Sequence, residues 1–221
     1  MVAGNPVILI ADDHPLFRGA LREALSGIGE QPEIVEAGDF EQAKSTLMEN
    51  RELDLILLDL RMPGTSGLSG LISLRGIAPD VPVIVVTASD SSEVIRRSLE
   101  LGASGFLSKS ASLDEIRSGI EKVLAGGVCV PDQADLGTEG DPEISDLIKR
   151  LQALTPQQTR VLSMLAEGLL NKQIAYELGV SEATIKAHVS AVLQKLGVDS
   201  RTQAVIQLSK IGPDTELTIQ P

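Results

Sequence analysis

Aromatic residues and cysteine are nearly absent from this 221-residue sequence. Aromatic side chains make up 2% of it and tryptophan is missing, so aliphatic side chains must fill the core and base-stacking platforms are nearly excluded. The single cysteine, Cys129, rules out a disulfide framework and a multi-cysteine metal site. With 43% hydrophobic residues, the chain can still build one large core or two small ones.

The sequence also lacks any hydrophobic run approaching the roughly 20 residues needed to cross a bilayer. Its start, from Met1 to Asp13, has neither the charged region nor the cleavage site of a signal peptide. We therefore expect a soluble, cytoplasmic protein without a membrane partner.

Negative charge predominates, but it is unevenly distributed. The formal net charge of −12 argues, by itself, against nucleic acid as a partner. Residues 1–130 hold 19 acidic and 11 basic side chains, and residues 131–150 hold six and two. Residues 151–210 hold four acids and six bases, which gives a net charge of +2. Only this last segment is compatible with binding to a phosphate backbone.

The first half alternates short apolar runs with amphipathic segments. Two of the runs, LILLDL and VIVVTA, are apolar throughout, which is typical of strands buried on both faces. Five strand–helix units in about 125 residues predict an α/β domain with a doubly wound, five-stranded parallel sheet. The predicted strands are Val7–Ala11, Glu33–Glu36, Asp54–Leu58, Val83–Thr87 and Gly105–Leu107.

Capping patterns predict where the intervening helices begin and end. The expected starts are Asp39-x-x-Gln42, Asp90-x-x-Glu93 and Ser112-x-x-Glu115, and the expected stops are Gly102 and Gly126.

A stretch rich in glycine, proline and acids, residues 127–141, predicts a linker. Asp141-Pro142 then predicts the start of a short helix with one apolar face. That face either packs on the second domain or pairs two chains, and both options stay open. Its residues are Ile144, Leu147, Ile148, Leu151 and Leu154.

The second half has no strand signal and predicts a small all-α domain. Thr155-Pro156-Gln157-Gln158 forms a capping box with proline at the first helical position. A second helix stops at Gly179-Val180-Ser181, and a third begins at Glu182. Two short helices joined by a tight glycine-containing turn are the signature of a helix-turn-helix. Ser200-x-x-Gln203 predicts the cap of a fourth helix.

Reactive side chains follow the predicted strands. Asp12 and Asp13 end the first strand, Asp59 ends the third, Thr87 ends the fourth and Lys109 follows the fifth. In a doubly wound sheet these positions meet at one edge, where function gathers. Three crowded carboxylates need a cation, and Mg²⁺ prefers oxygen ligands. Such a site can stabilise a phosphoryl group in transfer.

Each of these residues also has an ordinary structural interpretation. Asp12-Asp13 before His14-Pro15 is, taken alone, best explained as a helix cap. Asp59 fits a strand-to-helix turn, and Lys109 alone would be a solvated lysine. His14 is interpreted as a surface residue at a helix start, without a metal role. The joint placement at one edge favours the functional interpretation.

Four motifs, IADDH, LLDLRMPGTSG, VTAS and GFLSK, resemble in order and spacing those of response-regulator receiver domains, over residues 6–127. The resemblance implies a flavodoxin-like strand order and phosphorylation of Asp59 by a sensor histidine kinase. It implies that Asp12, Asp13, Asp59 and the backbone carbonyl of Arg61 hold Mg²⁺. It further implies that Lys109 and Thr87 contact the phosphoryl group. Phe106 matches the aromatic switch position, although it fits a plain core position equally well.

Residues 154–205 resemble the LuxR-type helix-turn-helix of NarL/FixJ regulators. They depart from the usual pattern at Gln157-Gln158, where Arg-Glu is usual, and at Leu170, where serine is common. In the recognition helix, Glu182–Leu196, we expect Lys186, Ala187 and Ser190 to face DNA with His188 on the flank. Candidate phosphate contacts are Asn171, Lys172, Lys195 and Arg201.

The sequence therefore predicts a phosphorylation-dependent transcriptional regulator rather than an enzyme. We expect a receiver at 1–127, a linker at 128–153, a DNA-binding domain at 154–211 and a frayed tail at 212–221. The expected partners are the kinase, double-stranded promoter DNA, a second copy of the chain on phosphorylation and, for an activator, RNA polymerase.

Three other functions fit the residues less well. A haloacid-dehalogenase-type phosphatase needs an aspartate two residues after Asp59, where this chain has Arg61. An FMN or nucleotide module needs a first turn that cradles phosphate, but ADDHP is acidic and has no glycine. A regulator that acts without phosphorylation stays possible in principle, but the complete acceptor site gives it no support.

Overall fold

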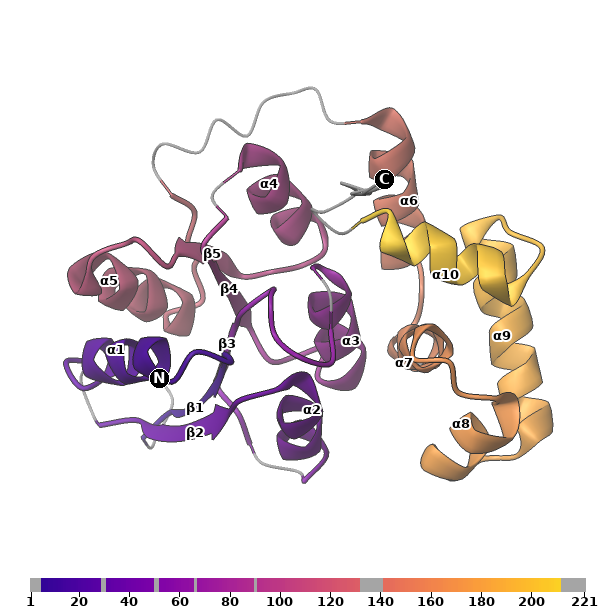
Figure 1. The fold of residues 1–221 in the computed structure, drawn as a ribbon, viewed down its shortest axis with the longest axis horizontal. Coiled ribbons are helices and arrows are strands. Elements are labelled where there is room, and N and C mark those ends of the chain that lie inside the picture. Colours follow the sequence, from indigo (N-terminus) through magenta and orange to yellow (C-terminus); the bar gives the residue numbers. More distant parts are fainter. Residues whose placement is uncertain are drawn as a thin grey trace, which may run out of the picture.

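The protein is described by a computed structural model covering residues 5–28, 31–49, 52–65, 67–89, 91–131 and 141–211. Its first half is built on a five-stranded, all-parallel sheet in the order β2-β1-β3-β4-β5 (Figure 1). This confirms the predicted fold class. The strands are β1 Val7–Ala11, β2 Glu33–Ala37, β3 Leu55–Leu58, β4 Val83–Thr87 and β5 Gly105–Ser108.

Helices cover both faces of the sheet and create a separate apolar layer on each side (Figure 1). One face carries α1 (Pro15–Leu25) and α5 (Leu113–Leu124), and the other carries α2 (Phe40–Met48), α3 (Ser69–Ile77) and α4 (Ser92–Glu100). Every residue of β3 and β4 is buried, as expected for strands covered on both sides.

Most of the predicted helix boundaries are present. The Asp39 side chain accepts a hydrogen bond from the backbone N–H of Gln42, and Ser112 forms a full capping box. Gly102 and Gly126 follow their helices with φ of 91° and 84°, which favours glycine. The expected start of α4 was wrong, because its capping side chain is Ser91, which accepts from the Val94 N–H. Asp90 itself lies outside the described residues.

The second half is helical, with α6 (Pro142–Gln152), α7 (Pro156–Ala166), α8 (Asn171–Glu177), α9 (Glu182–Leu196) and α10 (Arg201–Ser209). Thr155 and Ser200 form the predicted capping boxes of α7 and α10. The apolar face of α6 is buried and contacts α9, so it packs on the second domain. The middle of the expected linker, 132–140, and the expected frayed tail, 212–221, lie outside the described residues.

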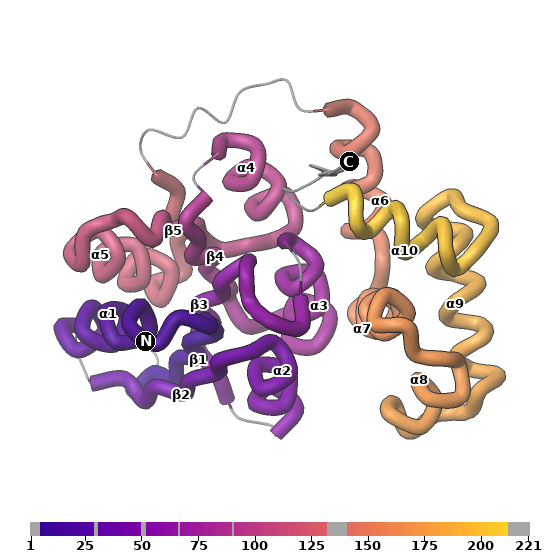
Figure 2. Tube along the Cα trace, in the orientation of Figure 1, coloured from indigo at the N-terminus to yellow at the C-terminus, as the bar shows by residue number. Residues whose placement is uncertain are grey.

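The two halves are packed against each other through α3 and α7 (Figure 2). A Cβ atom added at Gly76 of α3 would lie only 2.9 Å from the Cγ2 of Thr159 on α7, so glycine permits this close approach. One apolar cluster continues from the sheet through α3 into α7 and α9. Within the described ranges, no helix is long and apolar enough to cross a membrane.

Candidate phosphoacceptor site and nucleic-acid interface

The predicted acidic residues lie together at the carboxyl edge of the sheet. β1 is flanked by β2 on one side and β3 on the other, so the chain reverses its winding direction there and opens a crevice. Asp12 follows β1 and Asp59 follows β3, and the Asp59 N–H donates to the Ala11 carbonyl at 2.8 Å. The strand register thereby fixes the two carboxylates side by side.

Asp59 is almost completely buried, with 2% of its side chain exposed. Its Oδ1 accepts the Arg61 N–H at 3.0 Å, and its Oδ2 lies 2.7 Å from the Lys109 amine. Burial raises the pKa of the Asp59 carboxyl above its ordinary value, although the bonds from Lys109 and Arg61 act in the opposite direction. The site thus holds an acceptor oxygen in a shielded setting with one cation in contact.

Lys109 bridges two carboxylates. Its backbone N–H bonds to the Thr87 carbonyl, and its amine lies 2.7 Å from both Asp59 Oδ2 and Asp12 Oδ2. Burial lowers the pKa of Lys109, but the bonds to the two carboxylates outweigh this and raise it overall. The amine also lies 4.9 Å from the centre of the Phe17 ring, within the range of a cation–π contact. Lys109 is therefore held charged at the centre of the cluster.

Thr87 lies at this edge, whereas Phe106 lies two residues before the end of β5, and both are buried. Thr87 ends β4 and is 1% exposed, and its hydroxyl lies 3.4 Å from the Ser89 N–H. Phe106, in β5, is completely buried within the apolar core. In this conformation Phe106 fills space in the core.

His14 is exposed at the start of α1, as expected, but sequence reasoning missed its contacts with the acidic edge. Its ring reaches over the acidic edge, with Nδ1 2.6 Å from Asp13 Oδ1 and 3.3 Å from Asp12 Oδ1. The available signal was its place directly after two aspartates at a strand end, where the turn into α1 curls the side chain back over the carboxylates.

A divalent cation fits this donor set. Ligand atoms of Asp12, Asp13, His14 and Asp59 all lie within 4.8 Å of one another. Carboxylate oxygens are ligands that Mg²⁺ prefers, so the acidic cluster is compatible with Mg²⁺.

The outward face of α9 is open to solvent. Lys186, Ala187 and Ser190 are exposed and His188 is half-buried, whereas Ile185, Val192 and Leu196 point into the domain. Lys186 is 66% exposed and pairs with Glu182 one turn earlier at 3.1 Å. The face expected to meet DNA is therefore accessible.

The candidate phosphate contacts divide into two groups. Asn171 and Lys172 begin α8, and Lys172 is exposed. By contrast, the Lys195 amine donates to the Ala153 carbonyl and to Gln158, both at 2.8 Å. Arg201 donates to the carbonyls of Leu165 and Leu169 at the end of α7. In this structure Lys195 and Arg201 thus spend donors on the chain itself, and their phosphate contacts stay a prediction.

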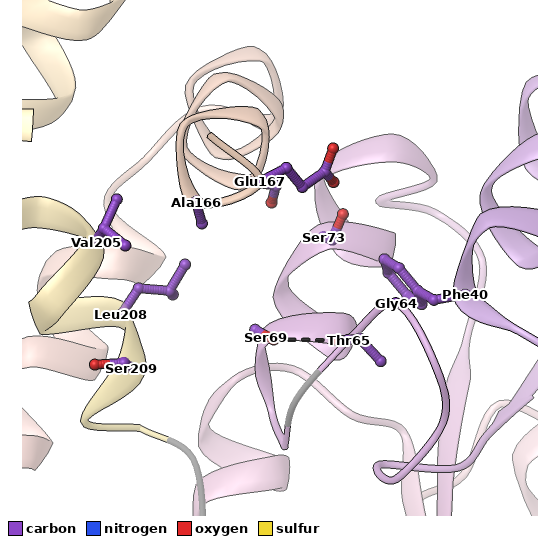
Figure 3. Close-up of a pocket in the computed structure, with 11 residues that line it drawn as sticks. Phe40, Gly64, Thr65, Ser69, Ser73, Ala166, Glu167, Val205, Leu208 and Ser209 are labelled. Carbon is purple, nitrogen blue, oxygen red and sulfur yellow. Dashed lines mark hydrogen bonds between the residues drawn. The ribbon is translucent and has the colours of Figure 1, made fainter. Parts of the chain in front are cut away.

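A pocket of about 370 Å³ lies between the domains, and none of the residues given as lining it belongs to the acidic cluster (Figure 3). It is bounded by α7 and α10 on one side and by α3 and the ring of Phe40 on the other, with Glu167 at its rim. Its walls are mainly short hydroxyl and aliphatic side chains, so it offers no set of convergent charges.

The fold and the site define a class of protein. The response regulator receiver domain matches residues 8–121, and the luxR family of bacterial regulatory proteins matches residues 152–208. The chain belongs to the two-component response regulators that carry a LuxR-type DNA-binding domain. These proteins are transcriptional regulators rather than enzymes.

Individual relatives span nearly the whole chain. The glycerol metabolism activator of Pseudomonas putida is 42% identical over 92% of this chain and 95% of its own. The nitrate/nitrite response regulator NarP of Escherichia coli K12 is 37% identical over 90% of this chain and 92% of its own. RcsB of Salmonella enterica serovar Typhimurium, solved on promoter DNA with a phosphomimetic, is 25% identical with a TM-score of 0.56 over 94% of this chain and all of that one.

Proposed function

We propose that Asp59 accepts a phosphoryl group from a sensor histidine kinase and that this controls binding of α9 to promoter DNA. The observation that carries the proposal is the contact of one amine, that of Lys109, with both Asp59 and Asp12 at 2.7 Å. This places a fixed positive charge beside the acceptor oxygen, where negative charge accumulates during phosphoryl transfer.

The reaction follows from the positions of these groups. An Asp59 oxygen attacks the phosphorus of phosphohistidine, a P–O bond forms as the P–N bond breaks, and the kinase imidazole leaves. Lys109 moves its contact from the carboxylate to a phosphoryl oxygen, and Thr87 turns its hydroxyl toward another. Mg²⁺ held by Asp12, Asp13, Asp59 and the Arg61 carbonyl would supply charge neutralisation when bound.

The proposed DNA contacts come from the exposed start of α9 and the adjacent α8. Lys186 reads a guanine edge or a phosphate, Ala187 touches a thymine methyl, and Ser190 bonds a base or phosphate, with His188 beside them. Asn171 and Lys172 contact the phosphate backbone. The proposal puts the protein in the cytoplasm, where promoter DNA is, with RNA polymerase as a further partner if it activates transcription.

The proposed active form is a homodimer. A solved arrangement of the related RcsB contains two dimers on two parallel DNAs, at 26% identity and a TM-score of 0.53. The DNA-binding half of this chain has a net charge of only +2, so a single copy should bind weakly. Two linked copies make the second contact effectively intramolecular.

Phosphorylation of Asp59 is tested with acetyl phosphate and Mg²⁺, followed by intact mass. One phosphoryl addition is expected for the unsubstituted chain, and none for Asp59→Asn or after chelation. Asp80→Asn is the matched control, because Asp80 is an exposed aspartate before β4, at the opposite edge of the sheet. Equal labelling of Asp59→Asn and Asp80→Asn would show that the acceptor lies elsewhere.

A further inference from the structure

His14 occupies a helix start without acting as a cap. It is the N-cap residue of α1, yet its side chain makes no capping hydrogen bond. Serine, threonine, aspartate and asparagine are the usual residues at this position, because a short side-chain oxygen can accept from the first turn. The imidazole instead lies over the carboxylates, and its Nδ1 is also 3.9 Å from Asp59 Oδ2.

An unsatisfied oxygen lies directly beneath this ring. Asp13 Oδ1 is buried and has no hydrogen bond with acceptable geometry, although His14 Nδ1 is only 2.6 Å away. The ring nitrogen is instead aligned with Asp12 Oδ1 at 3.3 Å. A buried carboxylate oxygen without a donor is costly, and a cation that takes this oxygen and the ring nitrogen as neighbouring ligands would satisfy both.

We propose that His14 is a metal ligand of this site, which makes it a mixed nitrogen–oxygen site. The inference rests on the proposed metal site and deepens it. Carboxylates suit Mg²⁺ and Mn²⁺, whereas imidazole favours first-row transition ions such as Co²⁺. His14 therefore shifts the selectivity of the site from Mg²⁺ toward Mn²⁺ and Co²⁺.

The position of the ring supports such a role. His14 is 64% exposed, whereas Asp12 and Asp59 are 1% and 2% exposed, so the imidazole forms the outer wall of a cluster whose floor is buried. Its backbone N–H donates to Asp12 Oδ1 at 2.8 Å, and this ties the residue to a carboxylate of the same site. A ligand at the outer wall can close over an ion that enters from solvent.

The decisive measurement is electron spin-echo modulation of bound Mn²⁺ in protein with ¹⁵N-labelled histidine. The chain has only two histidines, His14 and His188 on α9, so the second is a matched control. We expect imidazole nitrogen coupling in the unsubstituted protein and in His188→Ala, and none in His14→Ala. Coupling that persists in His14→Ala would overturn the proposal.

Affinity provides a second readout. Loss of a hydrogen-bond partner of a metal ligand already weakens metal binding by about tenfold or more. Loss of a direct ligand should therefore weaken Mn²⁺ and Co²⁺ binding by at least as much. Mg²⁺ affinity should change less. The ratio of Co²⁺ affinity to Mg²⁺ affinity should therefore fall in His14→Ala and remain unchanged in His188→Ala. Bound Mn²⁺ without nitrogen coupling overturns the role of His14 alone, whereas no Mn²⁺ binding by the unsubstituted protein overturns the metal site itself.

Discussion

Two nearly buried carboxylates depend on one amine at the phosphoacceptor site. Asp12 and Asp59 are 1% and 2% exposed, and both contact Lys109. Water cannot screen charges at this depth well, and removing one partner of a buried ion pair leaves an uncompensated charge. Lys109 therefore stabilises the folded state as well as serving the proposed phosphoryl transfer.

Lys109→Met should lower the free energy of unfolding by about 3–5 kcal/mol at neutral pH without divalent ions. Millimolar Mg²⁺ should recover part of this loss, because a bound cation replaces the missing positive charge. Urea unfolding with and without Mg²⁺ measures both effects. Lys122→Met, an exposed position on α5, should change neither quantity. An equal loss in the two variants would contradict the structural role of Lys109.

At the scale of elements, α9 combines a fixed start, a fixed end and a free face. Ser181 caps its start by accepting the Thr184 N–H, and Gly197 ends it with φ of 68°. Ile185, Val192 and Leu196 anchor the opposite side. The helix is thus fixed at both ends and along one side, while Lys186 stays in solvent and pairs with Glu182. Exposed pairs of this kind contribute about 0.3–0.5 kcal/mol to stability.

Lys186→Ala should therefore leave the fold almost unchanged and weaken specific DNA binding by about 1–3 kcal/mol, if the amine reads a base. If it contacts phosphate alone, all sequences should weaken similarly and the salt dependence should decrease. Titrations of cognate and random duplexes at several salt concentrations separate these cases. Lys149→Ala removes the same charge from an exposed position on α6 and is the control. If both substitutions weaken DNA binding equally, Lys186 contributes only through the net charge of the protein.

At the scale of the whole molecule, the receiver packs against the DNA-binding domain without covering the outer face of α9. A partly buried ion pair crosses the interface, between the Lys44 amine and Glu167 at 2.8 Å. Burial lowers the pKa of Lys44, but its bonds to Glu167 and Glu41 outweigh this and raise it overall, so the amine is charged at neutral pH. Leu208 of α10 lines the pocket that faces the receiver (Figure 3).

Gly76→Ala tests how closely the domains must approach. In an isolated helix alanine would stabilise by about 1 kcal/mol relative to glycine, but here its methyl group meets Thr159. We expect a larger radius of gyration in solution scattering and faster amide exchange in α7. Gly19→Ala is the control, because an added Cβ there meets no atom within 4 Å. If scattering and exchange are unchanged in Gly76→Ala, the side chains between α3 and α7 rearrange around the added methyl group and the domains stay together.

Phosphorylation should convert a monomer into a dimer. Light scattering with acetyl phosphate should show dimers at concentrations where the unmodified chain is monomeric. The preferred DNA should be an inverted repeat with half-sites about one helical turn apart. Ile206, 51% exposed on α10, is a candidate for the pairing surface, so Ile206→Glu should remove the advantage of two half-sites and retain binding to one. Phosphorylation that tightens binding to a single half-site, in a protein that stays monomeric, would instead favour relief of inhibition by the receiver.

The strands, most helix starts and the acidic edge could all be predicted from the sequence. Apolar runs such as LILLDL specify strands buried on both faces, and capping boxes such as that of Ser112 mark helix starts through neighbouring residues. Once the strands are known to be parallel, Asp12 and Asp59 must meet, because their strands end at the same edge. These are consequences of local chemistry and of one topological rule.

Only the tertiary structure decided which partner a side chain contacts when several are available. Lys195 and Arg201 bond to carbonyls of the α6–α7 turn and the end of α7, which no local pattern reveals. The ring of His14 also comes within 3.9 Å of Asp59 Oδ2, because β1 and β3 end beside each other. The close approach of Gly76 to α7 joins residues more than 80 positions apart. Sequence periodicity records which face of an element is buried, but the partner on that face depends on packing between segments remote in the chain.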